Sequence, residues 1–174
     1  MMHITAQGFN LRYAPDEDRV LLSVVLPDGQ DLSLPITRRL TRSLVDALAK
    51  IAADDKRLPA GIAPQFHETV LDFQHSQSVA EAVAEGHMRE TPPPAAPVHV
   101  ARLVHEVQIT PKADGSLSLV FNNSEQALTI EVEAARLHIV IETFVQIADR
   151  AGWDFTAAAA WLNPVKMAPG GAVN

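Results

Sequence analysis

The chain has 174 residues, of which 14 are Lys or Arg and 21 are Asp or Glu, so its formal net charge is −7. Hydrophobic residues make up 47% of the chain and charged residues 20%, which is typical of a folded protein and excludes a disordered tail or a collagen-like repeat. Because the chain has no cysteine, it has no disulfide, no thiolate nucleophile and no cysteine-ligated metal.

The first part of the chain, residues 1–60, predicts a β-β-β-α unit. Apolar and β-branched patterning indicates three strands, at residues 8–13, 19–26 and 31–36. Residues 27–30 have the Pro and Gly of a tight turn, and Pro35 favours a sheet edge or a strand end. Thr37 is a typical N-cap for the amphipathic helix that follows, which ends near Asp54.

The middle segment, residues 61–97, predicts a second helix and a proline-rich linker. The helix spans about 65–90, and we expect its apolar side to rest on the surface of the core. That side consists of Phe66, Val70, Phe73, Ala80, Val83 and Ala84, and the polar side has Glu68, Asp72, His75, Gln77, Glu81 and Glu85. Four prolines in residues 91–97 indicate a stiff, extended linker. The segment holds five acidic residues and one basic residue.

The last part, residues 98–163, repeats the opening pattern, and we expect it to share one core with the first. Its predicted strands are residues 98–110, 116–121 and 127–132, with a hairpin turn at 112–115. A helix begins near Ala134 and ends at Gly152, with Trp153 closing the cap. Residues 164–174 are predicted to be a flexible tail.

These elements predict an α+β fold, in which two β-β-β-α units flank an extra helix and the helices pack on one sheet or on two packed sheets. Duplication and convergent patterning both explain the similarity of the two units. The order of three strands, two helices, three strands and a closing helix resembles, in layout, the head domains of end-joining scaffold proteins and of centriole assembly proteins. The resemblance implies a fold and carries no function.

A basic cluster at the start of the first helix is a candidate anion site. Arg38, Arg39 and Arg42 lie in the first turns of this helix, where free amides and guanidinium groups together could bind a phosphate, a nucleic-acid backbone or a carboxylate. In the alternative interpretation, Arg42 pairs with Asp46, and the other two arginines reach the acidic turn at residues 16–18.

Catalytic and metal motifs are sparse. The sequence has no Gly-x-Ser-x-Gly elbow and no His-Glu-x-x-His pair, and no general base can be named. Glu68, Asp72 and His75 share one side of the second helix and are weak candidates for a metal site, although a solvated helix face has the same composition. We therefore predict neither a metal nor another cofactor.

The third helix carries Ile139 and Val145 outside its core stripe, so its apolar surface is wider than a one-sided helix needs. Either this helix is sandwiched within one chain or its second face meets another subunit. Ile139 and Val145 are therefore the candidate interface residues, and twofold association is the commonest form of assembly.

Taken together, the sequence predicts a non-enzymatic protein-interaction or assembly module that forms a homodimer. The alternative is an anion-binding or nucleic-acid-binding protein that uses the three arginines, and a metal-dependent enzyme ranks third. Residues 1–5 lack the basic head and apolar stretch of a signal peptide, and no apolar run reaches the length of a membrane span. We therefore expect a cytoplasmic protein that does not engage a membrane.

Overall fold

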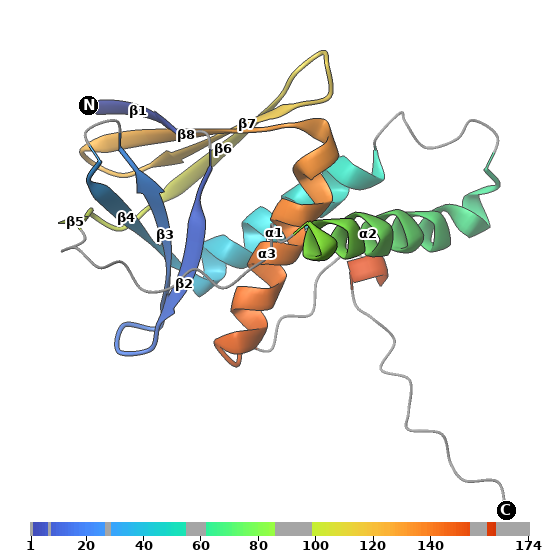
Figure 1. Cartoon of the computed structure of the whole chain (residues 1–174), viewed down its shortest axis with the longest axis horizontal. Helices are drawn as coiled ribbons and strands as arrows, with labels where there is room; N and C mark the ends of the chain where they lie inside the picture. The colour runs from blue at the N-terminus through green and yellow to red at the C-terminus, as the bar shows by residue number, and fades with distance from the viewer. Residues whose placement is uncertain are drawn as a thin grey trace, which may run out of the picture.

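The computed structural model describes residues 2–6, 8–26, 29–54, 62–85, 99–153 and 160–162. Four strands and a helix are followed by a second helix, four more strands and a third helix (Figure 1). The fold is α+β, as the sequence predicts, and its strands form two sheets of four strands each. No helix in the described ranges is both long and apolar enough to cross a membrane. The predicted linker at 91–97 and the tail at 164–174 lie outside the described residues.

The first sheet contains the meander predicted from the opening of the chain. Its strands, in spatial order, are β2 (Asn10–Ala14), β3 (Arg19–Val25), β4 (Asp31–Thr37) and β5 (His99–Val100). The first three are antiparallel neighbours, and Gly29 takes the positive φ of 81° that the turn between β3 and β4 requires. The predicted strands are confirmed within a residue or two at each end, whereas residues 27 and 28 of the predicted turn lie outside the described residues.

The second sheet contains the meander from the later half of the chain. Its strands, in spatial order, are β1 (Met2–Ala6), β8 (Gln126–Val132), β7 (Leu117–Asn122) and β6 (Glu106–Pro111). Antiparallel pairing joins β6 to β7 and β7 to β8, whereas β1 runs parallel to β8 with Ile4 opposite Leu128. The sequence did not predict β1, because its two buried residues, Ile4 and Ala6, are too few to give a strand pattern.

Each sheet therefore takes its fourth strand from the other half of the chain. The N-terminal β1 completes the second sheet, and β5 pairs in parallel with β4 to complete the first. Both sheets have the same order and the same pairing directions when β1 to β4 are matched with β5 to β8. The topology is compatible with duplication, which stays, beside convergent patterning, one of two explanations of the similarity.

The predicted single strand over 98–110 is wrong, because residues 101–105 cross from one sheet to the other. The Ala101 amide donates to the Ser33 carbonyl at 2.8 Å, and the Val104 amide donates to the Pro35 carbonyl at 2.9 Å. The next amide, that of His105, donates instead to the backbone carbonyl of Asn122 in the second sheet, at 3.0 Å. The backbone thus exchanges hydrogen-bond partners within a few residues, which a continuous strand in one sheet cannot do.

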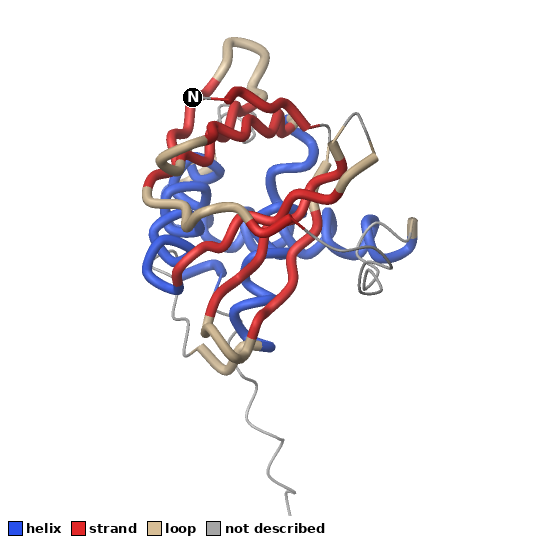
Figure 2. The backbone as a smooth tube through the Cα atoms, turned by 90° about the vertical axis from the view of Figure 1, so that its left-hand side faces the viewer, coloured by secondary structure: helices blue, strands red, loops and turns tan. Residues whose placement is uncertain are grey.

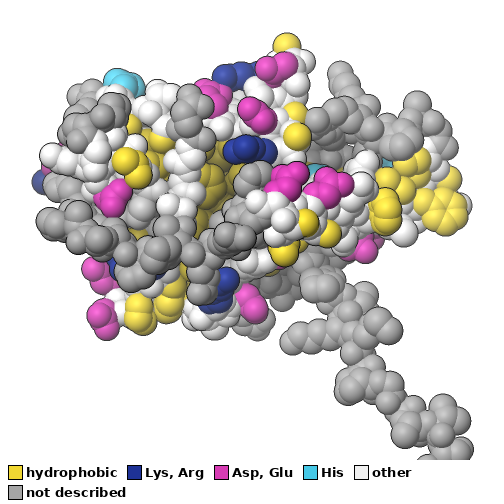
Figure 3. All heavy atoms as spheres, viewed as in Figure 1, with side chains coloured by type: hydrophobic (Ala, Val, Ile, Leu, Met, Phe, Trp, Pro, Cys, Tyr) yellow, Lys and Arg dark blue, Asp and Glu magenta, His cyan; other side chains and the backbone are white. Residues whose placement is uncertain are grey.

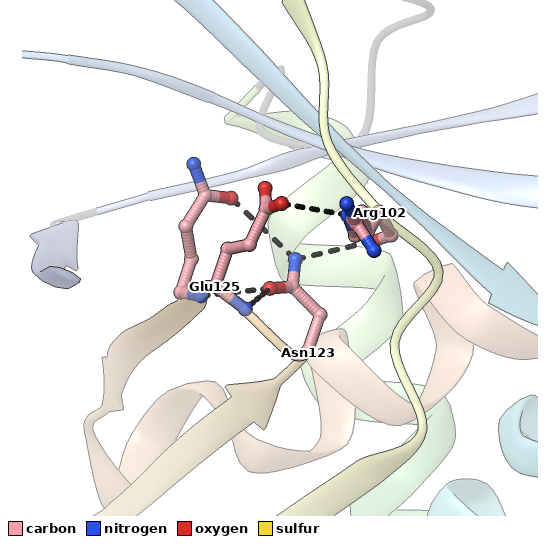
Figure 4. Close-up of polar contacts among 4 residues, drawn as sticks. Arg102, Asn123 and Glu125 are labelled. Carbon is pink, nitrogen blue, oxygen red and sulfur yellow. Dashed lines mark hydrogen bonds and ion pairs between the residues drawn. The ribbon is translucent and has the colours of Figure 1, made fainter. Parts of the chain in front are cut away.

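A fully buried asparagine fixes this crossing segment to the second sheet (Figure 4). The Nδ2 of Asn123 donates to the Arg102 carbonyl at 3.1 Å, and its Oδ1 accepts from the amides of Glu125 and Gln126 at 2.8 and 2.7 Å. The exposed side chains of Arg102 and Glu125 also form an ion pair, with the guanidinium 2.6 Å from the carboxylate. Asn123 therefore closes the turn between β7 and β8 and holds the crossing segment with one side chain.

The three helices are α1 (Arg38–Ala53), α2 (His67–Ala84) and α3 (Leu137–Arg150). Helices α1 and α3 pack with the sheets, whereas α2 packs on α3 (Figures 1 and 2). Residues from both sheets, α1 and α3 form one core, including Leu34, Leu48, Leu128 and Phe144. The α1 N-cap is Thr37, whose hydroxyl accepts from the Leu40 amide as predicted. Gly152 ends α3 with a φ of 66°, and the Trp153 amide donates back to Ala148, as the predicted cap requires.

Candidate functional site

The second helix, α2, lies at the periphery as predicted, but it faces the opposite way. Its buried residues are Leu71, His75 and Ala82, whereas Phe73 is 67% exposed and Val83 60% exposed. Phe66, which precedes the helix, is 56% exposed. The side that apolar composition assigned to the core therefore faces solvent, and a side containing a histidine packs on the protein.

This solvent-facing surface, called here the outer face of α2, contains five exposed apolar residues: Phe66, Phe73, Ala80, Val83 and Ala84. Figure 1 shows α2 extending beyond the sheets, and Figure 3 shows hydrophobic side chains gathered at its N-terminal end, with acidic side chains further along it. Two exposed phenylalanines, one at the start of the helix and one within it, are unusual for a solvated surface, which makes this the leading candidate site.

The inner side of α2 explains this orientation. His75 is 8% exposed, and its Nε2 donates to Oε2 of Glu142 on α3 at 3.0 Å. The other oxygen of Glu142 accepts from Gln146 at 2.9 Å. This buried, charge-assisted hydrogen bond and the apolar contact of Leu71 together hold α2 against α3. A single sequence could not predict this pair, because its partners are 67 residues apart.

Two aromatic rings lie against the histidine. His75 lies 5.5 Å from the ring of His138 on α3 and 5.3 Å from Trp161 in the short 3₁₀ helix η3 (Ala160–Leu162), measured between ring centroids. Within the described residues, neither Nδ1 of His75 nor Nε1 of Trp161 has a hydrogen-bond partner. A His–Glu pair becomes a catalytic triad only with a nucleophile on the other ring nitrogen. Among the described residues none occupies that place.

The pKa of Glu142 supplies a pH-dependent prediction. Burial alone would raise it, but hydrogen bonds from His75 and Gln146 outweigh burial and hold the pKa below its ordinary value of 4.5. The carboxylate therefore stabilises the fold fully above pH 4.5, and this contribution is lost as the pH falls through the lower folded-state pKa. We expect Glu142→Gln to reduce the free energy of unfolding by about 1 kcal/mol at pH 7.

Urea unfolding of both proteins at pH 7 and at pH 3 checks this expectation. The difference in the free energy of unfolding between the wild type and Glu142→Gln should shrink at pH 3, since a protonated glutamate resembles glutamine. The exposed and distant Glu133→Gln is the control and should change little at either pH. An equal difference in the free energy of unfolding at both pH values would contradict the assigned role of the Glu142 carboxylate.

The structure separates the three weak metal candidates. Glu68 and Asp72 are exposed, whereas His75 is buried and bonded to Glu142. In the described part of the chain, no group of three or more His, Asp or Glu side chains is arranged to hold a metal ion.

The three arginines are exposed at the start of α1, beside an acidic turn. Asp18 in this turn has a positive φ of 50°, and its Oδ1 accepts from Trp153 at 2.6 Å and from Tyr13 at 2.8 Å. These two hydrogen bonds lower the pKa of Asp18, and the positive charges of Arg38 and Arg19 lower it further. The proximity of Arg38 to Asp18 agrees with the intramolecular alternative for that residue, while Arg39 and Arg42 remain candidates.

The two interface candidates, Ile139 and Val145, are half-buried on α3. This helix contacts α1, α2 and β2, and Val145 packs against the main core. The sandwiched arrangement within one chain therefore accounts for much of the apolar width of α3.

Comparisons with protein-family models, with curated proteins and with solved structures found no match to this chain. Its function therefore has to be inferred from its own residues.

Proposed function

We propose that this protein is a non-enzymatic protein-interaction module that binds its partner through the outer face of α2. The observation that carries the proposal is the exposure of Phe73 on α2, and of Phe66 just before it, while the opposite side of the helix is anchored. Large apolar side chains that gather on one exposed surface mark interaction sites, because burying them against a partner removes apolar area from water.

The anchoring of α2 supports the same proposal. A helix held in place by Leu71 and by the His75–Glu142 pair presents its outer face in a fixed position before a partner arrives. Binding to such a surface costs less conformational entropy than binding to a segment that must first fold. Aromatic side chains also supply a large contact area with few rotatable bonds, which suits them to anchor an interface.

The test places a photo-crosslinking phenylalanine analogue at position 73 in cells that produce the protein, with Val25 as the matched control. Val25 is 65% exposed but lies at the end of β3, away from α2. We expect a discrete protein adduct at position 73 and none at position 25, and Phe66→Ser should reduce the adduct. If position 73 gives no adduct beyond that of position 25, the proposal is wrong.

Homodimerisation is a separate part of the proposal with its own measurement. Light scattering at high micromolar concentration should give twice the chain mass of 18.9 kDa. A monomer at that concentration would contradict the dimer and leave the interaction through α2 intact.

A further inference from the structure

We infer that the partner contributes a basic amphipathic helix, which packs lengthwise along the outer face of α2. This inference rests on the proposed function and adds the chemistry of the partner to it. Two features carry it: the spacing of the apolar residues and the charge on either side of them.

The apolar residues form a seam with a seven-residue spacing. Phe66, Phe73 and Ala80 follow each other at this interval, and Val83 and Ala84 extend the seam to the end of the helix. Seven residues make nearly two helical turns, so Phe66, Phe73 and Ala80 lie along one line, and Val83 and Ala84 lie on either side of its end. At 1.5 Å per residue the seam is about 25 Å long, which matches a partner helix of about 17 residues.

The borders of the seam are acidic. Asp72 immediately precedes Phe73 and Glu81 immediately follows Ala80, so the two carboxylates lie on opposite sides of the seam, and both are exposed. No Lys or Arg occurs between residues 65 and 85. In a helix pair, the charged residues that border the apolar seam form ion pairs with the other helix and so determine which helix binds. Lysine or arginine at the borders of the partner helix would pair with these carboxylates.

The same charges disfavour other occupants. Two copies of α2 packed on each other would bring acidic borders together, which costs energy in either direction of packing. Anionic lipid surfaces and nucleic acids would be repelled by the carboxylates. A basic helix gains from both the apolar seam and its borders.

The test uses a displayed library of 18-residue helices with fixed leucines at seam spacing and with border positions that encode Lys, Glu, Gln or Ser. Selection is made on the whole protein, and the best peptide is then measured by fluorescence anisotropy at low and moderate salt. The variants are Phe73→Ser and the double change Asp72→Asn with Glu81→Gln. Glu68→Gln is the control, because Glu68 is exposed but lies away from the seam.

We expect the selected borders to be rich in lysine. Phe73→Ser should weaken binding at least tenfold, the double variant should weaken it severalfold with a smaller salt dependence, and Glu68→Gln should change it little. Selection of acidic or neutral borders, indifference to Phe73→Ser, or no binder at all would overturn the inference. If a partner still crosslinks at position 73 in cells, the proposed function stands and only the chemistry of the partner is wrong.

Discussion

Leu71→Asp should destabilise the protein by about 4 kcal/mol, whereas Phe73→Asp, two residues later on the same helix, should change its stability by less than about 1 kcal/mol. Leu71 is 3% exposed, so the change removes about 2 kcal/mol of apolar burial and places an unpaired carboxylate in the core. Phe73 is 67% exposed and loses little on replacement. Phenylalanine and aspartate also have similar helix propensities.

Urea unfolding followed by circular dichroism measures both effects. Tryptophan fluorescence adds a local readout, because Trp161 lies against His75 beneath α2 and becomes exposed if the helix separates. If Phe73→Asp destabilised the protein as strongly as Leu71→Asp, α2 would have to face the other way. The outer face of α2 would then be part of the core, and both proposals would fail with it.

Ile4→Asp should destabilise the protein by about 4 kcal/mol, although residue 4 is close to the N-terminus. Ile4 is 7% exposed and pairs with Leu128 in the parallel ladder between β1 and β8. Replacing it removes a buried side chain from the main core and places a charge there without a partner. The N-terminal strand therefore contributes to the stability of the later half of the chain.

The matched control is Thr5→Asp, since Thr5 belongs to the same strand but is exposed. We expect this variant to cost less than about 1 kcal/mol. Thermal unfolding of the two variants and the wild type makes the comparison. A small effect of Ile4→Asp would mean that β1 is not held in the second sheet.

Local pattern predicts much of this fold. The three strands of the first meander, the last two strands of the second meander, the α1 cap at Thr37 and the α3 cap at Gly152 are all confirmed. Each depends on residues that lie close together in the sequence. The crossing at residues 101–105 could not be predicted, because it depends on distant carbonyl groups at Ser33 and Pro35. Such partners leave no trace in a single sequence.

The predicted orientation of α2 was wrong for a different physical reason. A count of apolar residues favours the phenylalanine side as the buried side, and the sequence analysis assigned it so. The buried side instead gains a charge-assisted hydrogen bond between His75 and Glu142, which hydrophobic patterning does not register. The conflict between pattern and packing is the reason that the outer face of α2 is proposed as a binding surface.

The exchange of first strands between the two sheets has a consequence for synthesis on the ribosome. Strand β1 is made before its partner β8, because residues 7–125 of the chain lie between the two strands. Ile4 and Ala6 therefore cannot be buried against β8 until the residues between the two strands have been made. Contacts between such distant residues slow folding and prolong the exposure of unpaired strand edges. A nascent chain of this protein can complete its second sheet only after β8 has left the exit tunnel.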